Sequence, residues 1–349
     1  MVSQVFSPRR GPLKTSLWRL RKHLTAHFEL HNNRKPASVE PSVSVSNLTK
    51  NYAGEHALAG ISFVVPRGCL FGLVGADGAG KTTLLRILTT LSDFDKGEVL
   101  VLGKDVVGYF LDLRKRIGYM PQKFSLYQDL TVRENLFFFA DIFGVKKTER
   151  KERMDRLLSF SRLGPFQNRR SRDLSGGMKQ KLALSCTLIH TPEILFLDEP
   201  TTGVDPVSRR EFWEILFDLK KQGITIIVST PYMDEAQRCD ELLFLHHGAI
   251  MKQGSPDDLL GAYPCKLFSV ESGEGPLSCA HDAIIPGYDA LLYPADGNLH
   301  VAVKNGSLTA EEVLSLVKTV APGAETCRAI APKIEDLFIY LLSGSDKKM

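Results

Sequence analysis

The sequence predicts an α/β protein in which helices cover a largely parallel β-sheet. Two observations lead to this prediction: short apolar runs alternate with longer amphipathic stretches from Val43 onward, and one apolar run leads directly into a glycine-rich loop followed by a helical pattern. Strands that alternate with helices along a chain tend to pair in parallel, because each helix returns the chain to the same edge of the sheet. A chain of 349 residues can bury one large core, or one large and one small.

The elements follow from the length and spacing of the apolar residues. Six short apolar runs are predicted to be strands, namely Val43–Val45, Ile61–Val65, Leu70–Val74, Ile194–Leu197, Ile224–Val228 and Leu242–Leu245. Four longer amphipathic stretches are predicted to be helices, namely Thr82–Leu91, Glu149–Phe160, Met178–Leu188 and Val207–Lys221.

The composition divides the chain into three parts, with boundaries at 1–40, 41–260 and 265–349. The first part holds eight Lys or Arg against two Glu, a charge of +6, so the whole-chain charge of +4 leaves −2 for the rest. The third part carries short strand-like pieces and a helical stretch at Ala310–Val320, and it closes with the apolar segment Ile334–Leu342. We expect it to be a small C-terminal α/β domain without catalytic residues of its own.

The basic N-terminal extension 1–40 contains apolar residues spaced three and four apart, at Leu13, Leu17, Leu20, Leu24 and Phe28. This spacing predicts a basic amphipathic helix that lies on an anionic membrane surface or packs on a partner. The alternative interpretation is a partly disordered tail with a helical tendency.

The cysteines and the apolar runs limit the class of protein. The six cysteines are scattered, with no CxxC pair, which favours a reducing cytosol and argues against a disulfide scaffold or a metal knuckle. No uninterrupted apolar run reaches the roughly 18 residues of a membrane-spanning helix. If the protein serves a membrane process, we expect another chain to cross the membrane.

The run Leu70–Val74 leads into a loop that fits the pattern G-x-x-x-x-G-K-[ST], and a helical pattern follows. In such a loop, backbone N–H groups and the helix N-terminus surround the phosphates of ATP. Lys81 supplies a charge to the β- and γ-phosphate oxygens and is expected to act in catalysis, and the Thr82 hydroxyl is expected to coordinate Mg²⁺. The predicted nucleotide contacts are Gly75, Ala76, Asp77, Gly78, Ala79, Gly80, Lys81, Thr82 and Thr83.

Two acids follow the apolar run Ile194–Leu197. A carboxylate at the end of a buried strand can face the Mg²⁺ of a phosphate loop, so Asp198 is the predicted metal ligand. The next residue, Glu199, can point toward the γ-phosphate and accept a proton from water, so it is the predicted general base.

A second helix start that could bind an anion lies at Leu174–Gln180, where Ser175, Gly176 and Gly177 open the predicted helix. One ATP cannot easily use two such sites of one fold. These residues are therefore predicted to contact the nucleotide of another subunit. The alternative is an ordinary N-capped helix start.

Together these motifs resemble the nucleotide-binding domain of ABC transporters, in that family's order, over about residues 43–255. Gly75–Thr83 resembles the Walker A loop, Ile194–Glu199 resembles Walker B, and Leu174–Gln180 resembles the LSGGQ signature, with Met178 in place of the usual Gln. The resemblance implies an ABC-type P-loop ATPase core with a helical subdomain.

The resemblance places this ATP-binding domain at 41–260 and its helical subdomain at about 122–190. It also assigns three single residues. Gln122 is similar to the Q-loop glutamine that senses Mg²⁺ and the membrane partner, which implies a catalytic and a metal-contacting role. Tyr52 lies where the family places an aromatic ring that stacks on adenine, and Asp205 lies in a segment similar to the D-loop.

The family implies an ATPase that works as a head-to-tail dimer, homo- or heteromeric, with ATP and Mg²⁺ held between one Walker A loop and the opposite signature. It further implies a separate transmembrane permease subunit and a location at the cytoplasmic face of the inner (plasma) membrane. The ending Ala331–Phe338 is similar to the tail of multidrug and antibiotic exporter ATPases, which indicates export. The segment Phe124–Leu136 resembles the surface that receives the coupling helix of a permease, although Tyr127, Leu130 and Leu136 equally suit a core.

Two departures from the family pattern affect the expected activity. Asp77 stands at a loop position that is more often Asn, and Pro231 stands where the family places a switch histidine. Proline offers no side-chain hydrogen bond to a γ-phosphate, and His246 and His247, beyond the next strand, are not expected to replace it. The sequence therefore predicts slow hydrolysis at this site.

Two alternatives stay open. One is a regulatory, weakly hydrolysing subunit paired with a catalytic paralogue. The other is a soluble ABC ATPase that acts on ribosomes or DNA, for which the slightly acidic body gives little support, so we expect no specific nucleic acid partner.

Overall fold

The computed structural model describes residues 40–123, 126–272, 283–284, 289–304 and 308–345. The predicted amphipathic helix of the N-terminal extension lies outside the described residues. Within the described ranges, no helix is long and apolar enough to span a membrane.

The central six-stranded sheet has the order β10-β9-β3-β8-β7-β6. All neighbouring strands run parallel except β9 and β10, which form an antiparallel pair at one edge. Its strands are β3 (Leu70–Val74), β6 (Ile117–Met120), β7 (Ile194–Asp198), β8 (Thr225–Thr230), β9 (Glu241–His246) and β10 (Ala249–Gly254). The prediction of a largely parallel sheet is confirmed for these strands.

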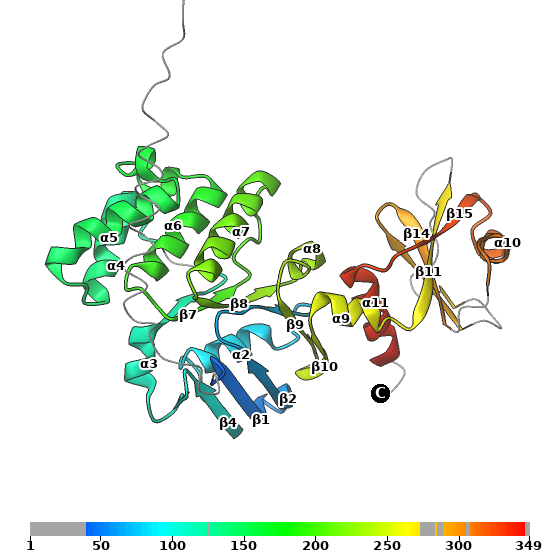
Figure 1. Ribbon diagram of the computed structural model, residues 1–349, viewed down its shortest axis with the longest axis horizontal. Coiled ribbons are helices and arrows are strands. Elements are labelled where there is room, and N and C mark those ends of the chain that lie inside the picture. Colours follow the sequence, from blue (N-terminus) through cyan, green and yellow to red (C-terminus); the bar gives the residue numbers. More distant parts are fainter. Residues whose placement is uncertain (1–39, 124–125, 273–282, 285–288, 305–307, 346–349) are drawn as a thin grey trace, which may run out of the picture.

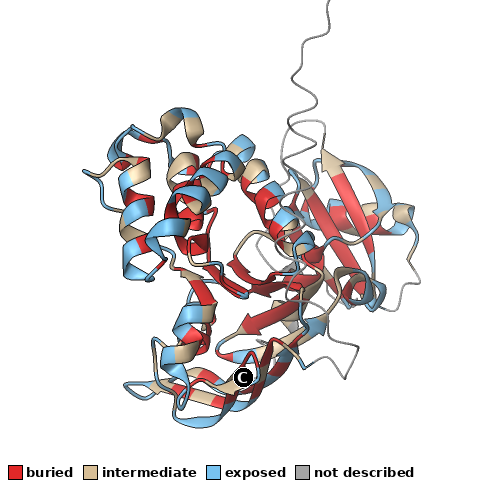
Figure 2. Cartoon of the chain, turned by 60° about the vertical axis from the view of Figure 1, so that its left-hand side comes forward, coloured by how far each residue is buried: buried red, intermediate tan, exposed pale blue. Residues whose placement is uncertain are grey.

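Side chains that alternate along β3 pack into two different cores, as the two-residue period of a strand requires. Phe71 and Leu73 join a core with α2 (Lys81–Leu88). Leu70 and Val74 join the opposite core, with α6 (Gly176–Leu188) and α7 (Pro206–Lys221). The sheet is therefore covered on both faces, and its central strands β3, β7 and β8 are buried throughout (Figure 2).

The first two predicted strands lie in a different sheet, which is antiparallel with the order β2-β1-β4-β5. Its strands are β1 (Val43–Tyr52), β2 (Glu55–Val65), β4 (Lys96–Val101) and β5 (Lys104–Asp105). Their expected place in one parallel sheet was wrong. The two residues between β1 and β2, Ala53 and Gly54, have φ angles of 48° and 94°, and a two-residue turn with positive φ at both positions joins antiparallel strands.

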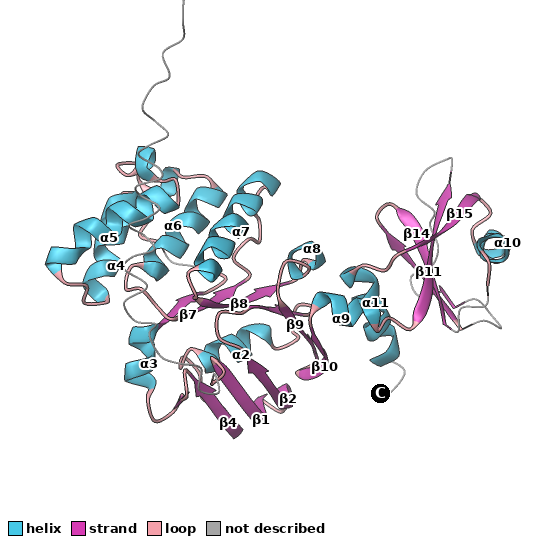
Figure 3. Ribbon diagram, viewed as in Figure 1, coloured by secondary structure: helices cyan, strands magenta, loops and turns pink. Residues whose placement is uncertain are grey.

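A group of helices between the two halves of the chain has its own core of buried residues, including Leu136, Met154, Leu158 and Leu182. The helices are α4 (Val132–Ile142), α5 (Lys147–Phe160) and α6 (Figure 3), whereas Leu113 of the short helix α3 (Phe110–Arg116) packs in the core with α2. Helix α4, which was not among the helices predicted from the sequence, begins with a capping box between Thr131 and Glu134. Leu136 is fully buried, whereas the Tyr127 ring is 47% exposed.

The C-terminal part is an antiparallel sheet of order β12-β13-β14-β11-β15, with α10 (Ala310–Val320) on one face. Its strands are β11 (Cys265–Ser272), β12 (Ala283–Ile284), β13 (Ala290–Ala295), β14 (Asn298–Lys304) and β15 (Ala324–Ile330). Helix α11 (Ile334–Ser345) returns to the main core, where Phe338 stacks on Phe244 of β9 (Figure 1). Two further short helices lie earlier in the chain, α8 (Met233–Ala236) between β8 and β9 and α9 (Pro256–Gly261) between β10 and β11.

Candidate functional site

The loop between β3 and α2 has the backbone geometry of an anion cradle. Gly78 and Gly80 have φ angles of 78° and 103°, values that side chains disfavour and glycine adopts freely. Ala76, Asp77 and Gly78 are exposed, as is Thr82 in the first turn of α2. The helix therefore starts directly behind an open loop, as phosphate binding at a helix N-terminus requires.

Lys81 lies inside this loop, with only 4% of its surface exposed. Its Nζ donates to the carbonyls of Gly75, at 2.8 Å, and Ala76, at 3.0 Å, and lies 3.5 Å from Oε1 of Glu199. An ammonium has three donors; two of them are engaged by the loop carbonyls, and the Glu199 carboxylate pairs with its charge. A phosphate oxygen that binds Lys81 competes with these oxygens for the ammonium.

Asp198 ends β7 and is 1% exposed. Its Oδ1 accepts a hydrogen bond of 2.7 Å from the Ser229 hydroxyl, and its Oδ2 is buried without a hydrogen-bond donor among the described residues. A buried carboxylate oxygen without a donor is rare, and carboxylate and hydroxyl oxygens are the protein ligands that Mg²⁺ takes. Asp198 and the exposed Thr82 thus suit a magnesium ion, although no contact between the two side chains is seen.

Glu199 has a φ angle of 47°, in the left-handed region that non-glycine residues seldom adopt. Its carboxylate accepts from the Gln122 amide at 2.9 Å and from the Thr202 hydroxyl at 3.3 Å, both at Oε2. Its backbone N–H donates to the Ser229 hydroxyl at 2.9 Å. The Glu199 carboxylate thus contacts both Lys81 and Gln122, and it follows Asp198 directly in the sequence.

A half-buried tyrosine of β6, Tyr119, lies near the Asp198 carboxylate. Burial, reinforced by the nearby Asp198 carboxylate, raises the pKa of Tyr119 to about 12. The phenol is therefore neutral at physiological pH. Among the described residues, Glu199 is the acid that an ion pair joins to the Lys81 ammonium and a hydrogen bond joins to the Gln122 amide.

The signature residues lie at the start of α6. Ser175 is its N-cap and accepts from the Met178 N–H at 3.3 Å, which is the ordinary capping role. Gly177 packs so closely on α7 that an added Cβ would lie 2.3 Å from the Ser208 Cβ. No hydrogen bond or ion pair in the described part of the chain joins Ser175, Gly176 or Gly177 to the phosphate loop.

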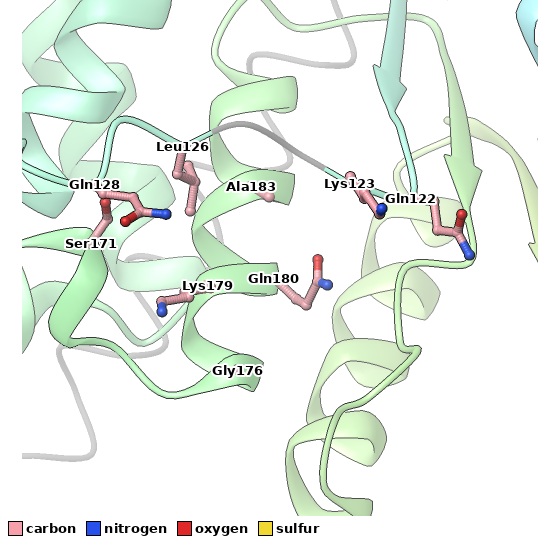
Figure 4. A pocket seen from close by; sticks show the side chains of 9 residues that line it. All are labelled: Gln122, Lys123, Leu126, Gln128, Ser171, Gly176, Lys179, Gln180 and Ala183. Carbon is pink, nitrogen blue, oxygen red and sulfur yellow. The ribbon is translucent and has the colours of Figure 1, made fainter.

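A pocket connects Gln122 to the same helix. Its walls include Gln122 and Leu126 on one segment and Gly176, Lys179 and Gln180 on the first turns of α6 (Figure 4). The glutamine whose amide binds Glu199 therefore also lines a space beside the signature.

Two remaining predicted residues lie at the ends of elements. Tyr52 ends β1 with its ring 46% exposed, and the Lys50 ammonium lies 5.1 Å from the ring centroid. Asp205 caps α7 and accepts from the N–H groups of Val207 and Ser208; the Ser208 N–H in particular lowers the pKa of its carboxyl. Neither residue contacts the phosphate loop through a hydrogen bond or ion pair in the described ranges.

Sequence reasoning missed Ser229, whose hydroxyl donates to Asp198 and accepts from the Glu199 N–H. Ser229 pairs with Asp198 in the parallel register of β7 and β8. That register depends on which strands become neighbours, and the sequence gives no direct signal of it.

The loop, the buried Lys81 and the two carboxylates at the carboxyl end of a parallel sheet define a P-loop nucleotide hydrolase. The family model described as "ABC transporter" matches residues 58–202. The chain belongs to the ABC transporter family, as an ATP-binding domain whose family reaction is ATP hydrolysis.

Several curated relatives support this assignment. The chain is 37% identical over 323 residues to the probable multidrug ABC transporter ATP-binding protein YbhF of Escherichia coli (strain K12), covering 87% of this chain and 52% of YbhF. It therefore spans about half the length of that relative. It is 40% identical over 234 residues to the Nod factor export ATP-binding protein I of Rhizobium sp. (strain N33), covering 66% of this chain and 77% of that protein.

Solved structures show the same fold. An ATP-binding subunit of an ABC transporter is 30% identical, with a TM-score of 0.57, and covers 62% of this chain and 91% of that chain. A dimeric ATP-binding cassette in a post-hydrolysis state, bound to ADP and Pi, is 26% identical, with a TM-score of 0.57, and covers 61% of this chain and 98% of that one.

Proposed function

We propose that this chain is the ATP-binding subunit of an exporter, and that Lys81, Gln122, Asp198 and Glu199 carry its ATPase reaction. The observation that carries the proposal is the contact of Lys81 and Gln122 with the Glu199 carboxylate, directly after Asp198 at the end of β7. Export is supported by the names of the relatives, a multidrug transporter protein and a Nod factor export protein.

In this proposal each residue has one task. Lys81 binds phosphate oxygens in place of the loop carbonyls, and the loop 75–83 donates backbone N–H groups. Thr82 and Asp198 hold Mg²⁺, with Gln122 nearby, and the ion neutralises charge on the phosphates when it is bound. Glu199 accepts the proton of the attacking water, and Gln122 orients its carboxylate.

The nucleotide site is completed in a dimer. Ser175, Gly176 and Gly177 form a helix N-terminus that no hydrogen bond or ion pair of the described residues connects to Gly75–Thr83. A second copy of the chain, or a paralogue, places that helix start against the ATP held by this loop. Tyr52, at the exposed end of β1, stacks on the adenine, and Asp205 lies at the interface of the two cassettes.

A permease docks on the helical subdomain in this proposal. Three large apolar side chains of α4 and its end are 40% to 60% exposed, namely Phe137, Ile142 and Phe143. The Tyr127 ring is 47% exposed and packs edge-on against Phe138 of the same helix. The pocket at Gln122 and Leu126 gives such a partner a path to the Glu199 carboxylate. The subunit would then work at the cytoplasmic face of the membrane that holds the permease.

A second candidate function is a regulatory subunit with slow turnover, and Pro231 favours it. Pro231 lies between the end of β8 and α8, and its side chain has no donor or acceptor. A catalytic paralogue would then supply the faster site of a heterodimer.

Affinity purification tests the proposed transport function. The tagged Glu199→Gln chain, expressed in its source cells and purified from detergent-solubilised membranes with ATP, should retain a protein with several membrane spans. A matched preparation of Lys81→Ala should lose the second ATP-binding domain. Recovery of ribosomes or DNA without any membrane protein would contradict the proposed transport function and support a soluble ABC ATPase.

A further inference from the structure

The backbone at Glu199 is strained, and its neighbours hold it in place. A φ of 47° at a non-glycine residue persists only where surrounding contacts fix the chain on both sides. On one side, the Glu199 N–H donates to the Ser229 hydroxyl, at 2.9 Å, and approaches the Ser229 carbonyl, at 3.2 Å. A second anchor follows two residues later, at Thr201.

Thr201 is 1% exposed, and its hydroxyl donates to Oε1 of Glu235 at 2.6 Å. Glu235 lies in α8 and is fully buried. A buried carboxylate is stable only when donors surround it, and here its Oε2 accepts from the Thr230 hydroxyl at 2.7 Å. The Arg209 guanidinium, with Nε 3.6 Å from Oε1, supplies the opposite charge.

Glu235 thus ties together three segments that surround the site. Thr201 belongs to the turn that follows Glu199, Thr230 ends β8 directly before Pro231, and Arg209 lies in α7. The Arg209 guanidinium also lies 4.4 Å from the centroid of the Tyr232 ring, on the far side of Pro231. The Pro231 side chain cannot form a hydrogen bond. The loop is therefore held by the residues on either side of it, since Thr230 binds Glu235 and Tyr232 contacts Arg209.

We propose that Glu235 is a positioning residue for ATP hydrolysis, which acts through the Thr201 hydroxyl to keep Glu199 in its left-handed conformation with the carboxylate directed at Lys81. The inference rests on the proposed role of Glu199 as general base. A purely structural role of Glu235 would stabilise the fold without any specific effect on the Glu199 carboxylate.

The test removes the hydroxyl while keeping the shape of the side chain. Thr201→Val should lower the rate of single-turnover hydrolysis of radiolabelled ATP by about 10- to 100-fold, the scale of a misplaced catalytic group. The Kd for ATP should stay within about twofold, because the phosphate loop is unchanged. Thr201→Ser keeps the hydroxyl and should restore most of the rate.

Glu235→Gln, which keeps the size of the side chain, should lower the same rate. Asp234→Asn is the matched control, since Asp234 is exposed on the same helix and lies 3.9 Å from the same Arg209. It should leave the rate unchanged. Thermal unfolding of every variant identifies any that fails to fold, and the rates of Thr201→Ser and Thr201→Val are compared at a temperature where both are folded.

A double-mutant cycle separates positioning from structure. In a Glu199→Gln background, Thr201→Val should change the residual rate by less than about twofold, because the positioned carboxylate is gone. A loss of the same factor in both backgrounds would overturn the positioning role. If Glu199→Gln alone hydrolyses ATP as fast as the parent chain, the proposed general base is wrong, and the positioning role is overturned with it.

Discussion

The Nζ of Lys81 lies 3.5 Å from Oε1 of Glu199, and the two side chains are only 4% and 9% exposed. This ion pair joins the phosphate loop to the end of β7. Because a γ-phosphate oxygen would compete with the carboxylate for the same ammonium, nucleotide binding and the position of the proposed base are coupled through one cation.

Removal of the Lys81 ammonium should abolish tight ATP binding. Lys81→Ala deletes charge-assisted hydrogen bonds to phosphate, which contribute about 3 kcal/mol together, or roughly a 100-fold rise in Kd. Titration with a fluorescent ATP analogue measures this change. Lys221→Ala, at an exposed lysine of α7, is the control, and an unchanged Kd for Lys81→Ala would contradict the assignment of the loop.

Glu199→Gln should keep ATP binding and lower turnover. The amide keeps the size of the side chain but cannot accept the proton of water, and general base catalysis contributes about 10²- to 10⁴-fold. Phosphate release at saturating ATP measures the loss, and size-exclusion chromatography with ATP should show a stable dimer. Glu193→Gln changes a half-exposed carboxylate just before β7 and should leave turnover intact. Equal turnover of the parent and Glu199→Gln would exclude Glu199 as the base.

The sequence predicts the phosphate loop well because all its chemistry is local. The strand Leu70–Val74, the glycines and Lys81 follow each other along the chain, and the structure has β3 with the predicted bounds. The same holds for Ala310–Val320, whose predicted bounds are those of α10.

Contacts between distant segments were not predictable. The Ser229 hydroxyl reaches Asp198 because β7 and β8 are neighbours in register, and Thr201 reaches Glu235 across 34 residues of sequence. The two-residue turn at Ala53 and Gly54 forms a hairpin. Such turns usually have Asn, Asp or Gly at the first position, whereas here an alanine adopts the positive φ, so the sequence carried only a weak hairpin signal. The pattern of apolar residues alone therefore placed β1 and β2 in the wrong sheet.

Pro231→His should raise the turnover of the purified chain. An imidazole at this position, after β8, adds a side-chain donor toward the γ-phosphate that proline lacks, and one such donor contributes up to about 10²- to 10³-fold. Pro231→Ala removes the ring without adding a donor and should stay as slow as the parent. Brisk turnover of the parent chain alone would contradict the expectation of a slow site.

The C-terminal domain contains a buried acid that should make stability depend on pH. Asp336, in α11, is 1% exposed. Its Oδ1 lies 2.7 Å from His300 Nδ1 and accepts from the Tyr293 hydroxyl at 2.8 Å, and its Oδ2 accepts from the Lys333 N–H at 2.7 Å. Burial alone would raise the pKa of Asp336, but these hydrogen bonds outweigh it and hold the pKa below the usual value.

A carboxyl with a lowered pKa in the folded state stabilises the fold above its unfolded pKa of about 3.9, and this contribution is lost as the pH falls through the lower folded value. Asp336→Asn should therefore lower the free energy of unfolding by about 2 kcal/mol at pH 7. The gap should persist down to about pH 5 and shrink below pH 4. Urea unfolding of the parent, Asp336→Asn and the exposed control Asp296→Asn measures it. A gap of the same size at pH 3 and pH 7 would show that ionisation of Asp336 contributes nothing.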